Sequence, residues 1–87
     1  MAKFSGRVKV HHNGEDLGRA AVYLVASDRG KRSWTGTAHS PNISFATLVR
    51  ETIELHLPTG DTVTAVVAGF DLEAGDAELH GTSPAPF

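Results

Sequence analysis

A hairpin-like stretch near the middle of the chain places the strongest constraint on the fold. Residues 55–70 read LHLPTGDTVTAVVAGF, in which two arms rich in Leu, Val, Thr and Ala flank Pro58-Thr59-Gly60-Asp61. Because Pro fixes φ and Gly accepts a positive φ, this pattern predicts a tight turn between two β-strands. An isolated hairpin is only marginally stable in water. The rest of the chain must therefore supply a sheet that covers the apolar arms.

The first twelve residues alternate with the period of a strand. Outward positions carry Lys3, Ser5, Arg7, Lys9 and His11, and inward positions carry Phe4, Gly6, Val8, Val10 and His12. Such alternation is typical of a strand with one buried and one solvated face. Asn13-Gly14 follows, which is the dipeptide that best tolerates the two positive φ angles of a type I′ turn.

Four further segments are predicted to be strands, with less ambiguity than residues 43–57. They are residues 19–27, 32–39, 62–72 and 77–82, separated by turn residues rich in Gly, Pro, Asp and Asn. Gly69 predicts a bulge, after which Phe70 and Leu72 turn inward.

Residues 43–57 allow two interpretations. The frequent β-branched residues favour a long strand that bends or bulges around Arg50-Glu51-Thr52. The alternative is a helix with Phe45, Leu48, Val49, Thr52 and Ile53 on one stripe.

The predicted fold is therefore all-β: six strands in an antiparallel meander that closes into a small barrel and so removes the sheet edges. Residues 1–83 form the single domain, and residues 84–87 form an extended tail whose Phe87 packs back on the barrel. Trp34-Thr35-Gly36-Thr37 and Leu79-His80-Gly81-Thr82 are each followed by a Ser-Pro pair. This internal echo suggests two pseudo-symmetric three-stranded halves.

The charge and the amino-acid composition exclude some classes of function. The chain has 87 residues, a net charge of −2 and no cysteine. The charge gives no reason to expect nucleic-acid binding, and the missing cysteines exclude disulfides and thiolate chemistry. Neither a signal peptide nor an 18-residue apolar run is present. We expect a cytoplasmic protein that does not bind a membrane.

Several short motifs together resemble a known family. They are Phe4-x-Gly6, Trp34-x-Gly36, the Leu-Pro-x-Gly hairpin at residues 57–60, and Gly81 shortly before Pro84-x-Pro86-Phe87. This pattern resembles a family of small actinobacterial domains of unknown function, which occur alone or attached to flavin-dependent monooxygenases. The resemblance implies an all-β stand-alone or accessory domain, and it implies no catalytic residues.

Few residues carry an obvious chemistry. His11 and His12 point to opposite faces of one strand, and a strand separates His56 from His80, so we expect no metal site. Glu51 lies inward as a buried acid or base if its strand is regular, and outward if the strand bulges. Residues 28–32 are charged enough to hold a phosphate, but a solvated turn is the simpler interpretation. No catalytic residue and no cofactor are predicted.

The strand at residues 19–27 is apolar on both faces, with Tyr23 and Val25 on the second face. A subunit interface or a few exposed apolar residues would each produce this pattern. Tyr23, Trp34 and Phe70 form either a base-stacking surface or, for the last two, part of the core.

We therefore predict a non-catalytic interaction module that binds itself as a homodimer or binds another protein. The alternatives are a carrier of a small apolar ligand, because many inward residues are Gly or Ala, and an accessory domain of a flavin-dependent monooxygenase system. A small enzyme that uses Glu51 or a histidine at a subunit boundary is a further alternative. The candidate ligand or interface residues are Tyr23, Val25, Trp34, Glu51, His56 and His80.

Overall fold

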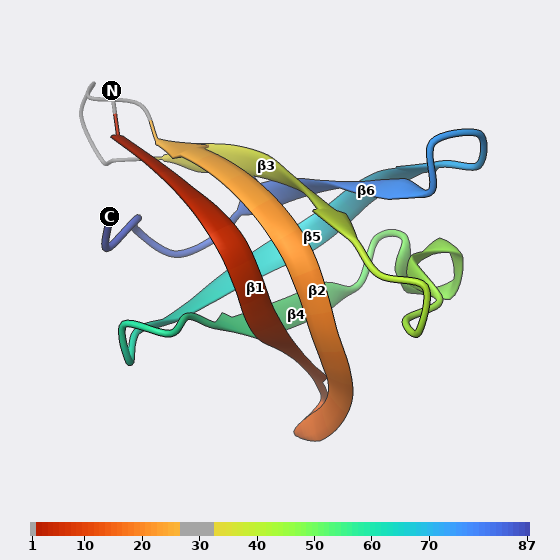
Figure 1. Ribbon diagram of the computed structural model, residues 1–87, viewed down its shortest axis with the longest axis horizontal. Coiled ribbons are helices and arrows are strands. Elements are labelled where there is room, and N and C mark those ends of the chain that lie inside the picture. Colours follow the sequence, from red (N-terminus) through yellow and green to blue (C-terminus); the bar gives the residue numbers. More distant parts are fainter. Residues whose placement is uncertain (1, 27–32) are drawn as a thin grey trace.

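The computed structural model describes residues 2–26 and 33–87 (Figure 1). Its strands are β1 (Ala2–His12), β2 (Glu15–Ala26), β3 (Trp34–His39), β4 (Thr52–His56), β5 (Thr62–Asp71) and β6 (Asp76–Gly81), and a 3₁₀ turn, η1 (Phe45–Leu48), precedes β4. All neighbouring strands are antiparallel and the sheet closes into a barrel. The predicted all-β antiparallel barrel is thereby confirmed. The charged turn at residues 28–32 and its phosphate-binding alternative lie outside the described residues.

The strand order around the barrel is β1-β2-β3-β6-β5-β4. Each half of the chain is thus a three-stranded meander, as the internal echo suggests, and the halves meet through β3–β6 and β1–β4. A meander running through all six strands would instead pair β3 with β4. It does not form because residues 40–51 cross from one meander to the other as a loop and η1.

The two seams between the halves differ in length. β3 and β6 pair over five residues each. β1 and β4 pair over only three, from Lys9–His56 to His11–Glu54. The remaining residues of β1 pair with β2 alone, so the barrel is most weakly closed between β1 and β4.

The long strand predicted for residues 43–57 is wrong over its first half, and the helical alternative is wrong over its second half. Phe45 and Leu48 are both buried in η1, which packs against β5 and β6. Side chains three residues apart eclipse in a 3₁₀ turn, so this short turn directs both into the core. Arg50 has a φ of 74° and reverses the chain direction before β4 begins at Thr52.

Side chains fill the inside of the barrel. Leu24, Ile53, Leu55 and Leu79 are each 0% exposed, and they are joined by five buried alanines: Ala20, Ala26, Ala38, Ala65 and Ala77. A Cβ on Gly36 would meet the Leu24 side chain at 2.5 Å. Gly36 therefore leaves space for the side chain of its strand partner Leu24, and the small inward residues favour a packed core over a ligand cavity.

Trp34 and the C-terminal tail close one end of this core. Trp34 is 2% exposed, and its Nε1–H donates a hydrogen bond of 2.8 Å to the Ser83 carbonyl. The Phe87 ring lies edge-on to the indole at 6.2 Å and tilted against Phe4 at 6.3 Å. Trp34 is thus a core residue, and Phe87 packs on the barrel as expected.

Of three local predictions, about the Asn13-Gly14 turn, the bulge at Gly69 and the position of Leu72, two are confirmed and one is wrong. Asn13 and Gly14 have φ angles of 52° and 80°, as a type I′ turn requires, and β2 begins directly after them at Glu15. The predicted bulge is present between Val67 and Gly69. However, Leu72 is 83% exposed instead of inward, because β5 ends at Asp71 and Leu72 lies in the turn.

Candidate functional site

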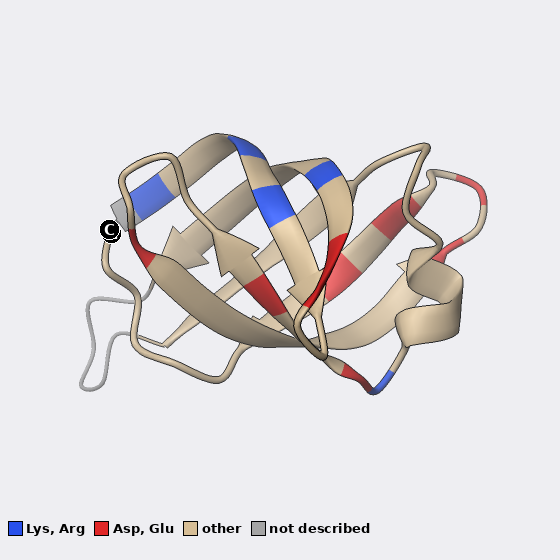
Figure 2. Ribbon diagram, turned by 90° about the horizontal axis from the view of Figure 1, so that it is seen from below, with Lys and Arg blue, Asp and Glu red and all other residues tan. Residues whose placement is uncertain are grey.

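Three cationic side chains gather on the outer face of β1 and β2. Lys9 lies directly opposite Arg19 in the antiparallel register, and Arg7 is two residues before Lys9 on the same face. They line a surface groove together with Val8, His56, Leu57 and Pro58. Arg7 and Arg19 also border a second hollow, whose other wall includes His39 and Pro41. Figure 2 shows the basic residues along one side of the barrel.

This cationic groove (Arg7, Lys9 and Arg19) has no internal neutralisation. No ion pair joins any of the three to a carboxylate in the part of the chain that the structure describes. Like charges directly opposite each other on neighbouring strands are destabilising. An anionic group placed in the groove would relieve the repulsion between Lys9 and Arg19.

The turn between β5 and β6 carries the opposite charge. Asp71, Glu73 and Asp76 surround the exposed Leu72. The Asp71 Oδ1 accepts hydrogen bonds from the backbone N–H groups of Glu73 and Ala74, at 2.9 and 3.2 Å, which fixes the shape of the turn. Figure 2 shows this acidic turn projecting from one end of the barrel. It presents an apolar side chain flanked by carboxylates to solvent.

His39 places the acidic turn beside the second hollow. Its Nδ1 lies 3.0 Å from the Gly75 carbonyl oxygen and 3.2 Å from the Asp76 Oδ1. Since His39 also lines the hollow bordered by Arg7 and Arg19, the acidic turn and the cationic groove lie near each other on one molecule, on either side of that hollow.

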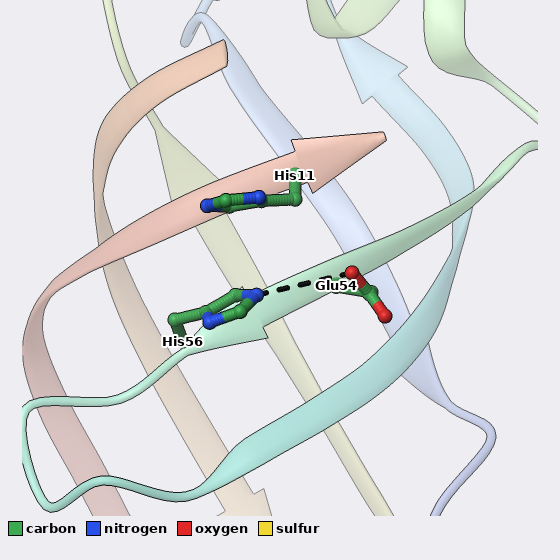
Figure 3. A group of neighbouring side chains, drawn as sticks. All are labelled: His11, Glu54 and His56. Atoms are coloured by element: carbon green, nitrogen blue, oxygen red, sulfur yellow. Dashed lines mark ion pairs between the residues drawn. The ribbon is translucent and has the colours of Figure 1, made fainter. Parts of the chain in front are cut away.

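A second cluster lies where β1 meets β4. His11 faces Glu54 in the register, and His56 is two residues further along the same face of β4. The His11 and His56 rings stack with their centroids 4.1 Å apart, and the His56 Nε2 lies 3.8 Å from the Glu54 Oε1 (Figure 3). One ligand atom from each of the three residues lies within 4.8 Å of the others. This is a donor set of two imidazoles and one carboxylate.

The six candidate residues from the sequence do not form one site. Trp34 is buried, whereas Tyr23 on the neighbouring strand is 46% exposed and Val25 is half-buried. A stacking surface that includes both Tyr23 and Trp34 is therefore absent. The His80 side chain is 57% exposed and lies 3.6 Å from Glu78. Of the six, only His56 belongs to the cluster at the β1–β4 seam.

The Glu51 side chain points outward, as expected if the chain does not continue as a regular strand at this position. It precedes β4, its side chain is 52% exposed, and its Oε1 lies 3.2 Å from the His12 Nε2. The reversal at Arg50 turns this carboxylate away from the core, while the Glu51 carbonyl accepts a hydrogen bond of 3.0 Å from the Val67 N–H. Glu51 is therefore not the buried acid or base of the inward alternative.

Positions along the chain suggested comparing His11 with His12 and His56 with His80, but they gave no indication that His11 pairs with His56. The pairing depends on β1 closing against β4, which strands forty residues apart in sequence do only when the two halves come together. The Glu-x-His spacing of residues 54–56 was visible, but the same spacing occurs at residues 78–80. Spacing alone therefore does not distinguish the site.

The fold and surface define a small closed β-barrel with a packed interior and charged outer grooves. Comparison of the chain with models of known families, with curated proteins and with solved structures gives no match. The resemblance to the actinobacterial family therefore stays a prediction. Within residues 2–26 and 33–87, no helix has the length and apolar character needed to span a bilayer.

Proposed function

We propose that this protein is a non-catalytic interaction module that forms a homodimer, in which the acidic turn of each copy (residues 71–76) lies in the cationic groove of the other. The observation that carries the proposal is the direct opposition of Lys9 and Arg19, neither of which has a carboxylate partner among residues 2–26 and 33–87. Such an arrangement lowers the stability of the isolated barrel and is relieved when an acidic segment binds.

A second copy supplies the required chemistry. The acidic turn offers the Glu73 carboxylate and the 83% exposed Leu72, so it provides both a charge for the groove and apolar area to bury. In a two-fold dimer each contact is made twice, which doubles a contribution that is small for any single exposed ion pair.

Other occupants fit less well. Leu24, Ile53 and Leu55 are each 0% exposed, which favours a packed interior over a cavity for a small apolar ligand. The net charge of −2 and the nearby acidic turn oppose a nucleic acid. A role as an accessory domain of a flavin-dependent monooxygenase system stays an expectation from the resemblance.

Sedimentation equilibrium of charge-reversed variants tests the proposal. We expect a dimer at low ionic strength that weakens with added salt, since salt screens exposed charges. Arg19→Glu and Glu73→Arg should each give a monomer, because each places like charges across the contact. The double variant Arg19→Glu/Glu73→Arg should recover the dimer with reversed charges.

Leu72→Ser tests the apolar part of the contact. Burying a leucine side chain contributes roughly 1.5–3 kcal/mol and the contact is made twice in the dimer, so its loss should weaken dimerisation by about a hundredfold or more. Tyr23→Ser is the matched control for an exposed apolar side chain outside the contact, and it should leave the dimer unchanged. A monomeric wild-type chain at micromolar concentration and low salt would refute self-association, and a monomeric double variant would refute this particular contact.

A further inference from the structure

We propose that His11, Glu54 and His56 bind a divalent transition-metal ion of the zinc class and leave part of its coordination sphere open. The site adjoins the proposed dimer contact, because His56 also lines the cationic groove, but metal binding does not depend on that contact. The three side chains project from the same outer face of two neighbouring strands (Figure 3). No other protein segment has to move to bring them together.

The geometry lies within side-chain adjustment of a tetrahedral site. Zinc–ligand bonds of about 2.0–2.1 Å keep two ligand atoms roughly 3.3 Å apart. The ligand atoms of His11, Glu54 and His56 already lie within 4.8 Å of one another. Rotation of the side chains closes the remaining gap, while the β1–β4 register holds the three Cα positions.

An independent observation concerns the His56 Nε2. Although the His56 side chain is 39% exposed, this nitrogen is buried and has no hydrogen-bond partner. Its nearest carboxylate oxygen, on Glu54, is 3.8 Å away, beyond hydrogen-bond distance. A buried polar atom without a partner is destabilising, and a metal ion held between Glu54 and His56 would satisfy it.

The donor set selects the metal class. Two imidazoles and one carboxylate match the three protein ligands found in zinc sites that keep a position for water. Ca²⁺ and Mg²⁺ prefer sites made wholly of oxygen ligands. Because His11 comes from the first meander and Glu54 and His56 from the second, the bound ion would also link the two halves of the barrel across their short seam.

Isothermal titration of the untagged chain with Zn²⁺ tests the site, and the visible spectrum of bound Co²⁺ reports histidine coordination. We expect binding of one ion at micromolar affinity. His11→Gln, Glu54→Gln and His56→Gln should each weaken binding at least tenfold. His80→Gln is the matched control, because Glu78-x-His80 repeats the Glu54-x-His56 spacing on an outer face, and no third ligand joins it among the residues that the structure describes. This substitution should change affinity less than twofold.

Lys9 supplies a test in the opposite direction. Lys9 is the register partner of His56, and its positive charge would repel a bound dication, so Lys9→Gln should tighten Zn²⁺ binding by about threefold. Melting curves without metal show that each variant is folded, since these are surface substitutions. Absence of binding at micromolar Zn²⁺, an unchanged affinity in His11→Gln, or equal losses in His56→Gln and His80→Gln would each overturn the proposal.

Discussion

The close approach of Gly81 to Trp34 predicts a large effect from a single methyl group. A Cβ built on Gly81 would overlap the indole atoms Cε2, Nε1 and Cδ2 of Trp34. The indole has little freedom to move away, because it is 2% exposed, bonded to the Ser83 carbonyl and packed against Phe87. Gly81→Ala should therefore be strongly destabilising.

The expected loss of stability in Gly81→Ala lies between the cost of overpacking the core and the cost of displacing the indole completely. Overpacking a core costs about 1–3 kcal/mol, and complete displacement of a buried tryptophan costs about 3–5 kcal/mol, as for its truncation. Replacing Gly by Ala returns about 0.4–1 kcal/mol through the unfolded chain. We expect a net loss of about 2–4 kcal/mol from a total of roughly 4–13 kcal/mol for a chain of this length, which lowers Tm by about 10–30 °C.

Urea unfolding followed by fluorescence and circular dichroism measures this loss. Trp34 is the only tryptophan, so its emission reports directly on the altered position. Gly69→Ala is the matched control within a neighbouring strand, because its Cβ would meet only the Glu78 carboxylate at an ordinary 3.8 Å. If Gly81→Ala unfolds within about 0.5 kcal/mol of Gly69→Ala, the packing of the indole on Gly81 is refuted.

Three further substitutions test other parts of the structure. Trp34→Ala should cost about 3–5 kcal/mol because it empties one end of the core, and wild-type-like melting by circular dichroism would instead place Trp34 on the surface. Arg50→Gly should raise the free energy of unfolding by about 0.5 kcal/mol, because Arg50 has a φ of 74° and glycine adopts this conformation without steric cost; a lower midpoint in urea would contradict this. Glu51→Ala should change stability by less than about 1 kcal/mol, since its contact with His12 is an exposed pair; a larger change in thermal melting would show that the carboxylate has a structural role.

Local patterns in the sequence predicted most of the strands. The alternation in residues 3–12, the Asn13-Gly14 turn and the bulge at Gly69 are each set by neighbouring residues, and each is present. The segment around Phe45 was misassigned because η1 is stabilised by packing against β5 and β6, which are distant in sequence. A four-residue turn is too short to show a periodicity of its own.

The candidate sites were harder to predict than the fold. His11 and His56 become neighbours only because β1 closes against β4, and the sequence contains no local signal for that pairing. Lys9 and Arg19 were both expected to be on strands, but their direct opposition depends on the exact register of the hairpin. Which side chains come together in a candidate site depends on which strands pair. Whether a segment forms a strand depends on residues next to each other in the sequence.

The short contact between β1 and β4 has a consequence for aggregation. If it opens, the barrel becomes a six-stranded open sheet whose two free edges are β1 and β4. Free edges recruit other chains by strand addition, and lysine on an edge opposes this. In such an open sheet, the charged residues Lys3, Arg7 and Lys9 on the β1 edge would oppose fibre-like association.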